Sequence, residues 1–369
     1  MIKPLPYVEK IQPYIPGKPI KEVERELGIK ECIKLASNEN PLGPSPKVIK
    51  AIKEFLSNPA ELARYPEGSG YYLKNALCEF FSKKRINLTP DEIILGNGSN
   101  ELIDIAVKTY VGPGDEAVMA KPSFVVYAMS VTSQGGIPKE VPLRDWKHDL
   151  KGMLKEVTDR TKIVFISNPN NPTGTMNYKK DFAEFMKAIP DGILVIVDEA
   201  YYEYVIDSEY PDTLKYFQEG RDILILRTFS KAYGLASLRI GYGIAKKEII
   251  KEMNKIREPF NTNTIAQIAA ETALKDEKHL KKILKINEKG KKYIYSELDK
   301  IKEIKYLPTQ TNFIYIILPD SISSQEVFDF LLKNGVIIRK VGLNQIRVTI
   351  GLPEENKAFI NSLKKFFGG

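Results

Sequence analysis

The strongest constraint on the fold is a regular alternation of short apolar segments with helical ones through the middle of the chain. The apolar segments predict strands at Glu92–Leu95, Glu116–Ala120, Lys162–Ser167, Ile193–Val197 and Ile223–Leu226. Helices are expected between them, at Asn100–Val111, Phe124–Gln134 and Tyr178–Ala188. Strands that alternate with helices typically form a parallel sheet covered on both faces. The sequence therefore predicts an α/β protein with a mostly parallel central sheet flanked by helices.

The two ends of the chain follow other patterns. The first 43 residues are rich in proline, which favours an extended arm, with one short helix at about Ile20–Leu27. After Asn263 the chain is helical and lysine-rich through Ile301, and strand-like runs follow at Asn312–Leu318, Val336–Arg339 and Ile346–Ile350. We therefore expect an arm at 1–39 that joins the small domain, a large domain at 40–265 and a small α+β domain at 266–369.

Composition excludes several classes of protein. No run of 18 apolar residues occurs and the first residues lack an apolar signal segment, so we expect a soluble, cytoplasmic protein. The net charge of +8 indicates a lysine-rich surface, because the cations are not clustered with aromatics as nucleic-acid binding requires. Two cysteines without motif spacing and two histidines support neither a disulfide framework nor a metal site. Only 11 of the 55 cations are arginines, so the positions of these guanidinium groups, which suit oxyanion binding, are informative.

The segment Gly96-Asn97-Gly98-Ser99-Asn100-Glu101 follows a predicted strand and opens a predicted helix. Free backbone N–H groups and the helix dipole favour an anion such as phosphate at this point. A dinucleotide-binding fingerprint is the competing interpretation, but Glu101 replaces its third glycine and no acidic residue ends a second strand at the expected distance. A plain strand-to-helix turn without a ligand remains open.

Two further motifs follow neighbouring strands. Asn168-Pro169-Asn170-Asn171-Pro172-Thr173-Gly174 comes after Lys162–Ser167, at the strand end where open α/β sheets bind ligands, although it could be a bare turn. Asp198 closes the apolar run Ile193–Val197. A carboxylate there needs a cation or a strong donor, unless it serves only as a helix N-cap.

The densest group of reactive side chains is Arg227-Thr228-Phe229-Ser230-Lys231, with Arg239 shortly after it. Two hydroxyls, a lysine and an arginine suit a bound phosphate beside a reactive amine. A lysine whose pKa is lowered in such a site can form a Schiff base. A solvated basic loop is the alternative.

These motifs, in this order, resemble the fold-type I pyridoxal-phosphate aminotransferases, and among them the histidinol-phosphate aminotransferase family. The resemblance includes Pro13-Tyr14, the segment Lys34–Pro41, Arg64-Tyr65-Pro66 and Ile346–Gly351, so it extends over nearly the whole chain. It implies a large domain that binds pyridoxal 5'-phosphate and a smaller α+β domain.

The resemblance also implies roles for individual residues. Lys231 would be the lysine to which the cofactor is attached and would later move the substrate proton. Asp198 would pair with the pyridinium nitrogen, Asn171 and Tyr201 with the phenolic oxygen, and Phe124 would stack on the ring. The phosphate would be bound by Gly98, Ser99, Asn100, Thr228, Ser230 and Arg239, with Tyr65 reaching it from the other subunit. The substrate would be bound by Tyr14, Arg339 and Arg347.

The implied activity is the transfer of an amino group in histidine biosynthesis. L-Histidinol phosphate and 2-oxoglutarate would give imidazole-acetol phosphate and glutamate, in a homodimer with shared active sites and without metal, membrane or nucleic acid. Arg257-Glu258-Pro259-Phe260-Asn261-Thr262 resembles a broad-specificity branch, so an aromatic amino-acid aminotransferase, or dual specificity, stays open. A pyridoxal-dependent phosphothreonine decarboxylase is a further alternative.

Overall fold

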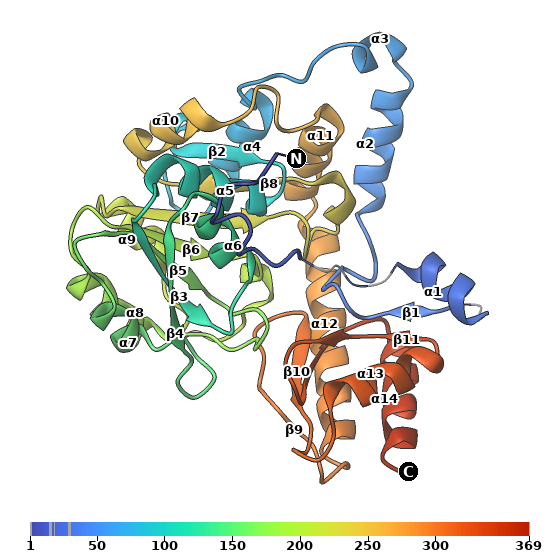
Figure 1. Ribbon diagram of the computed structural model, residues 1–369. Helices are drawn as coiled ribbons and strands as arrows, with labels where there is room; N and C mark the ends of the chain where they lie inside the picture. The colour runs from blue at the N-terminus through green and yellow to red at the C-terminus, as the bar shows by residue number, and fades with distance from the viewer. Residues whose placement is uncertain (1, 15–16, 18, 29–30, 369) are drawn as a thin grey trace.

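The computed structural model describes residues 2–14, 17, 19–28 and 31–368. Its largest element is a seven-stranded sheet with the strand order β2-β8-β7-β6-β5-β3-β4 (Figure 1). Its strands are β2 (Ile93–Gly96), β3 (Glu116–Lys121), β4 (Ile137–Pro142), β5 (Thr161–Ser167), β6 (Leu194–Asp198), β7 (Ile223–Thr228) and β8 (Gly241–Ile244). Every neighbouring pair is parallel except the two pairs that contain β8. The prediction of an α/β fold with a mostly parallel sheet is therefore confirmed.

The central strands are apolar on both faces, because successive side chains point to opposite sides of a strand. In β5, Ile163 and Phe165 pack into one apolar cluster while Val164 and Ile166 pack into the other. The first cluster is completed by three helices: α5 (Ser99–Tyr110), α6 (Val126–Ser133) and α10 (Lys247–Ile256). The opposite face is covered by α2 (Pro46–Leu56), α4 (Tyr71–Ser82), α7 (Leu150–Lys155), α8 (Lys179–Ala188), α9 (Thr213–Gln218) and α11 (Thr264–Leu274). Short connecting helices lie at α3 (Pro59–Leu62), η1 (Pro90–Glu92), η2 (Tyr202–Tyr204) and η3 (Ala236–Leu238).

Two strands of this sheet were not predicted. The strand β8 has the sequence Gly-Tyr-Gly-Ile, which lacks the apolar run that marks the other strands. Its glycines suit close packing, since a Cβ on Gly243 would lie 3.0 Å from the side chain of Leu224. The edge strand β4 contains two prolines and only one buried residue, so its pattern is also weak. The predicted helix at Phe124–Gln134 begins later, at Val126.

A second sheet of four strands lies in the C-terminal third. It has the order β12-β13-β10-β9 and packs against the helices α12 (Glu277–Leu298), α13 (Ser324–Lys333) and α14 (Pro353–Phe366) (Figure 1). Its strands are β9 (Lys305–Tyr306), β10 (Phe313–Ile317), β12 (Arg339–Lys340) and β13 (Gln345–Thr349). The single strand predicted at Val336–Arg339 is wrong, because Ile338 separates β11 (Val336–Ile337) from β12 and the two belong to different sheets.

The N-terminal segment contributes one strand to a separate two-stranded sheet. The predicted helix Ile20–Leu27 is present as α1, and β1 (Ile33–Lys34) pairs in parallel with β11. Nearer the N-terminus, Tyr7 lies against Gly135 on the large sheet's side, where a Cβ on that glycine would be 3.3 Å from the tyrosine ring. No helix among the described residues is long and apolar enough to cross a membrane.

Candidate active site

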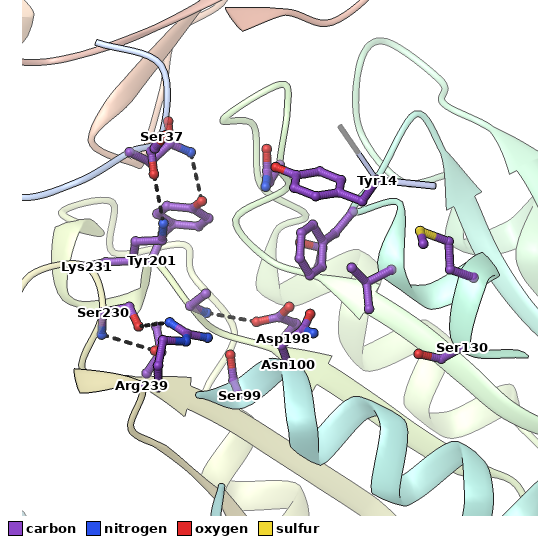
Figure 2. Close-up of a pocket in the computed structure, with 18 of the residues that line it drawn as sticks. Tyr14, Ser37, Ser99, Asn100, Ser130, Asp198, Tyr201, Ser230, Lys231 and Arg239 are labelled. Atoms are coloured by element: carbon purple, nitrogen blue, oxygen red, sulfur yellow. Dashed lines mark hydrogen bonds between the residues drawn. The ribbon is translucent and has the colours of Figure 1, made fainter. Parts of the chain in front are cut away.

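A cavity of about 670 Å³ lies where the parallel strands of the large sheet end, next to the four-stranded sheet (Figure 2). Carboxyl ends of parallel strands meet at one edge, so motifs distant in sequence converge there. Most of the predicted site residues line this cavity: Tyr14, Ser99, Asn100, Phe124, Asn171, Asp198, Tyr201, Thr228, Ser230, Lys231, Arg239 and Arg347. Gly98 lies directly beside Arg239, whereas Tyr65 and Arg339 are not among the lining residues.

Lys231 follows the end of β7 and points its amine into the cavity (Figure 2). Its Nζ donates a hydrogen bond to the main-chain oxygen of Ser37 at 3.1 Å. Burial, and after it the positive charge of Arg347, lowers the pKa of Lys231 to about 8. The amine is therefore neutral far more often at neutral pH than an exposed lysine, and a neutral amine is a nucleophile and a base.

Asp198 is the last residue of β6 and 6% of its surface is exposed. Its Oδ2 accepts a hydrogen bond from the hydroxyl of Tyr127 at 2.7 Å, and its Oδ1 accepts one from the main-chain N–H of Ala200 at 3.1 Å. Burial raises the pKa of Asp198, and these two hydrogen bonds oppose the rise. A cationic partner in the cavity would stabilise the carboxylate form.

The predicted phosphate cup is formed by the start of α5 and the connection from β7 to β8. Arg239 lies against Gly98, so closely that a Cβ there would be 2.4 Å from Nη2. Gly98 also has a φ of +78°, a conformation that glycine adopts without strain. Arg239 donates to the hydroxyl of Ser230 at 3.3 Å, and the Thr228 hydroxyl accepts from the Ser230 main chain at 3.1 Å. The cup thus combines hydroxyls, a guanidinium and a helix N-terminus, which together suit an anion.

A second cationic group faces the cavity from the four-stranded sheet. Arg347 donates to Oδ1 of Asn171 at 2.6 Å and to the main-chain oxygen of Ala36 at 2.8 Å. Its Nε is buried and has no hydrogen-bond partner, and neither Arg347 nor Arg339 forms an ion pair with any described carboxylate. Arg339 lies beside Arg347 in the register of β12 and β13, and its guanidinium is 5.3 Å from the ring centre of Tyr14. Arg347 can hold an anionic group in the cavity, and Arg339 adds positive charge beside it, next to Tyr14.

Tyr65 lies outside the cavity. It is 81% exposed and stacks on Phe260, with ring centroids 4.7 Å apart. Within one chain it therefore cannot contact the phosphate cup through the described arrangement. The predicted contact from a second subunit requires an exposed tyrosine of this kind.

Sequence reasoning missed three groups next to the predicted residues: the Tyr127 hydroxyl, the Ser37 carbonyl and the Asn38 side chain. Tyr127 comes three positions after Phe124, and this spacing places side chains on one face of a helix. That signal was available, since a helix was expected there. The contact of Lys231 with Ser37 uses the main-chain oxygen, so the residue type at position 37 could not have predicted it.

Comparison with known proteins places the chain among enzymes. Residues 30–363 match the family model described as aminotransferase class I and II. The histidinol-phosphate aminotransferase of Moorella thermoacetica is 47% identical over 360 residues, which cover 96% of this chain and 90% of that protein. The protein of the same name from Caldicellulosiruptor saccharolyticus is 45% identical over 363 residues, 97% of this chain and 98% of the relative.

Solved structures give the same placement. The crystal structure of histidinol-phosphate aminotransferase from Sinorhizobium meliloti in complex with pyridoxal-5'-phosphate matches with a TM-score of 0.88 and 27% identity, over 98% of this chain and 96% of that one. The histidinol-phosphate aminotransferase from Clostridium acetobutylicum matches with a TM-score of 0.81 and 26% identity, over 91% and 99%. The chain therefore belongs to the aminotransferase class I and II family.

Proposed function

We propose that the protein is a histidinol-phosphate aminotransferase, which exchanges an amino group between L-histidinol phosphate and 2-oxoglutarate to give imidazole-acetol phosphate and glutamate. The observation that carries this proposal is the placement of Lys231, with its lowered pKa, in one cavity with Arg347, a half-buried guanidinium without a described acidic partner. An aminotransferase needs the first group for proton transfer and the second for an anionic substrate. The relatives at 42–47% identity over nearly the full length support the substrate assignment.

The donor set fits pyridoxal 5'-phosphate as the cofactor. When bound, this cofactor supplies an aldehyde carbon for the amino group and a ring that accepts electrons from the substrate carbon. Lys231 would attach it covalently, and Asp198 would pair with the ring nitrogen. Tyr201 and Asn171 would hydrogen-bond the phenolic oxygen, and Phe124 would stack on the ring face. Gly98, Ser99, Asn100, Thr228, Ser230 and Arg239 would bind its phosphate, because hydroxyls and a guanidinium meet there beside the N-terminus of α5.

The protein's own groups account for the proton and charge steps. Neutral Lys231 Nζ would take the proton from the substrate carbon and deliver it to the cofactor carbon that carried the aldehyde, before the oxo product is released. Asp198 in its carboxylate form stabilises positive charge at the nitrogen that faces it, and the Tyr127 hydrogen bond keeps this carboxylate ionised. Burial of these groups strengthens each electrostatic interaction.

Both half-reactions need a cationic group that binds the phosphate or carboxylate of the substrate. Histidinol phosphate has no α-carboxylate, so Arg347 and Arg339 would hold its phosphate, and in the second half-reaction they would hold a carboxylate of 2-oxoglutarate. Guanidinium can bind either oxyanion with paired hydrogen bonds. Tyr14, against Arg339, would close the substrate side of the cavity.

An aromatic amino-acid aminotransferase is the second candidate. The observation that favours it is the apolar part of the cavity lining, where Ile11, Val126 and Met129 adjoin Phe124. Such a surface accepts a phenyl ring as readily as an imidazole ring. A phenylalanine donor, however, offers only one carboxylate to two arginines.

The assembly is part of the proposal. We infer a homodimer in which Tyr65 reaches the partner's phosphate cup, because this tyrosine is exposed and fixed against Phe260. The division into an arm at 1–39, a large domain at 40–265 and a small domain at 266–369, like the cytoplasmic location, stays a prediction. The pairing of β1 with β11 supports the attachment of the arm to the small domain.

The test of the proposed function is chemical. Borohydride reduction of the purified, pyridoxal-phosphate-loaded protein should fix the cofactor on Lys231, as peptide mapping would show. In a separate experiment, the unreduced, cofactor-loaded enzyme is mixed rapidly with the amino donor, and the change in cofactor absorbance is followed over a single turnover. At low donor concentration, histidinol phosphate should produce this change faster than phenylalanine does. Lys231→Ala should retain the fold and lose at least ~10³-fold in rate. An adduct on another lysine, or a higher kcat/KM for phenylalanine, would reject the assignment.

A further inference from the structure

Asn38 connects the catalytic cavity to the four-stranded sheet. It is 1% exposed and has a φ of 54°, a left-handed conformation that asparagine adopts more readily than most residues. Its main-chain N–H donates to the Thr349 hydroxyl at 2.9 Å, and its carbonyl accepts from the Asn312 side chain at 3.0 Å. Thr349 ends β13 and Asn312 precedes β10, so the second sheet fixes the position of Asn38.

The same contacts fix which end of the Asn38 amide faces the cavity. The Thr349 hydroxyl accepts from the Asn38 main chain, and its own proton is donated to Asn38 Oδ1 at 3.3 Å. The amide nitrogen is therefore the atom that faces Tyr201, and Nδ2 donates to the Tyr201 hydroxyl at 2.8 Å. An amide nitrogen can only donate, so the tyrosine oxygen must accept in this contact.

That contact determines the direction of the Tyr201 proton. A phenolic hydroxyl has one proton to donate, and since Asn38 supplies a donor, the Tyr201 proton must point elsewhere. Tyr201 is 4% exposed, and its ring is fixed edge-on against Phe313 with centroids 5.1 Å apart. Burial raises the pKa of Tyr201 to about 12, so the proton is present at neutral pH. The open direction is the cavity that Tyr201 lines together with Lys231 (Figure 2).

We propose that Asn38 is a positioning residue that orients the Tyr201 hydroxyl as a donor toward the cavity. The inference rests on the proposed function, in which Tyr201 donates to the phenolic oxygen of the cofactor. In the deprotonated form of the lysine–cofactor linkage, no proton on the neighbouring nitrogen balances the negative charge of the phenolic oxygen. A hydrogen bond donated to that oxygen therefore stabilises the deprotonated form more than the protonated one. Asn38 thus lowers the pH at which the linkage titrates, although it does not itself contact the cofactor.

The experiment is a pH titration of the visible absorbance of the loaded enzyme, without substrate. Asn38→Gly keeps the left-handed backbone and removes the donor, so the midpoint should rise by about 0.5 to 1 pH unit. Tyr201→Phe should raise it at least as much. In the double variant, Asn38→Gly should add nothing to Tyr201→Phe, because it acts only through the hydroxyl. Thr349→Ser, which keeps the anchoring hydroxyl, is the matched control and should leave the midpoint unchanged.

A second variant covers loss of folding in Asn38→Gly. Asn38→Asp keeps the side-chain shape and tolerates the same backbone, but its carboxylate only accepts and so draws the Tyr201 proton away from the cavity. Its midpoint should rise further than that of Asn38→Gly, and part of this rise should disappear in the Tyr201→Phe background. An unchanged midpoint in the single variants, or equal shifts with and without the tyrosine hydroxyl, would overturn the role of Asn38. If the wild-type protein showed no cofactor absorbance and formed no adduct on Lys231, the proposed function itself would be overturned.

Discussion

Tyr65 and Phe260 form a parallel stacked pair at the surface, with ring planes inclined by 16°. Phe260 has a φ of 57°, which is unusual for an aromatic residue, so the local backbone holds the ring in a defined place. A tyrosine that is this exposed, yet fixed by stacking, is suited to contact a partner rather than its own chain.

The first prediction is that Tyr65 acts in the partner's active site. Tyr65→Phe subunits mixed with Lys231→Ala subunits, after dissociation and reassociation, should regain activity because each hybrid dimer contains one site with both groups intact. The mixture should reach roughly a quarter of the wild-type activity, since half of the dimers are hybrids. The parent variants assayed alone are the controls. Activity no higher than the average of the parents would count against a shared site.

The second prediction concerns the two arginines. Arg347→Ala should reduce kcat/KM in both half-reactions by roughly 30- to several-thousand-fold, because loss of one partner of a desolvated charge pair costs about 2–5 kcal/mol. Arg339→Ala should affect histidinol phosphate more than phenylalanine, which lacks the dianionic phosphate. Arg339→Lys, which keeps the charge, is the matched control. If Arg339→Ala weakened both donors equally, the aromatic assignment would be favoured.

The third prediction is the pH dependence of cofactor capture. Since the pKa of Lys231 is about 8, its amine is half neutral at that pH, whereas an ordinary lysine is less than about 1% neutral. The rate at which cofactor-free protein takes up pyridoxal phosphate should therefore rise through pH 8 and level off above it. Arg347→Ala removes a charge that lowers this pKa, so the rise should move to higher pH, and Arg347→Lys should move it less. A rate that keeps rising to pH 10 in the wild type would contradict the lowered pKa.

The fourth prediction concerns Tyr127. Tyr127→Phe removes the hydrogen bond to Asp198 Oδ2, so the pKa of Asp198 should rise further and the carboxylate should bind the ring nitrogen less strongly. Cofactor affinity measured by equilibrium dialysis should fall about tenfold, which corresponds to the loss of one hydrogen bond to a charged group. Phe165→Leu, which alters the ring stacked on Tyr127 but no hydrogen bond, is the control. Equal losses in the two variants would assign the effect to packing.

The fifth prediction is a stability change with pH caused by His148. Burial lowers the pKa of His148 to about 4, and its Nε2 lies 3.1 Å from Oδ1 of Asn170. In the unfolded chain the pKa is about 6.5, so between these values the unfolded state binds a proton that the folded state does not. The free energy of unfolding should therefore be greatest above pH 6.5 and fall toward pH 4, by at most about 1.4 kcal/mol per pH unit from this group.

Urea denaturation at a series of pH values checks this contribution. His148→Gln should make the dependence shallower between pH 6.5 and 4. An unchanged slope in His148→Gln would show that other groups cause the acid instability.

The sequence motifs indicated which residues would meet in one cavity because each motif is local. Asp198, Asn171 and Lys231 each lie at or just after the end of a strand with a clear apolar run, and parallel strands bring their carboxyl ends together without any long-range information. The contacts that were not predicted depend on how elements pack. The Tyr127 hydroxyl reaches Asp198 across 71 positions, and Asn38 reaches Tyr201 across 163 positions.

The same limit applied to the fold. The strand β8 was missed because glycines replace the apolar residues that mark a strand. These glycines leave room for side chains of β7 and β2, the strands with which β8 pairs. Val336–Arg339 was predicted as one strand because its pattern is continuous, while the chain changes sheets at Ile338. A local sequence pattern predicts that a strand forms but not which strand it pairs with.

The antiparallel return from β7 to β8 has a consequence for how specificity can diverge in such a scaffold. Ser230, Lys231 and Arg239 all lie in that one connection, beside Thr228, so four of the groups assigned to the cofactor form a single local unit on the large sheet. Arg339 and Arg347 belong to another sheet. Substitutions near Arg339 in β12 can therefore change which anion is accepted while the cofactor-binding groups on the large sheet stay in place.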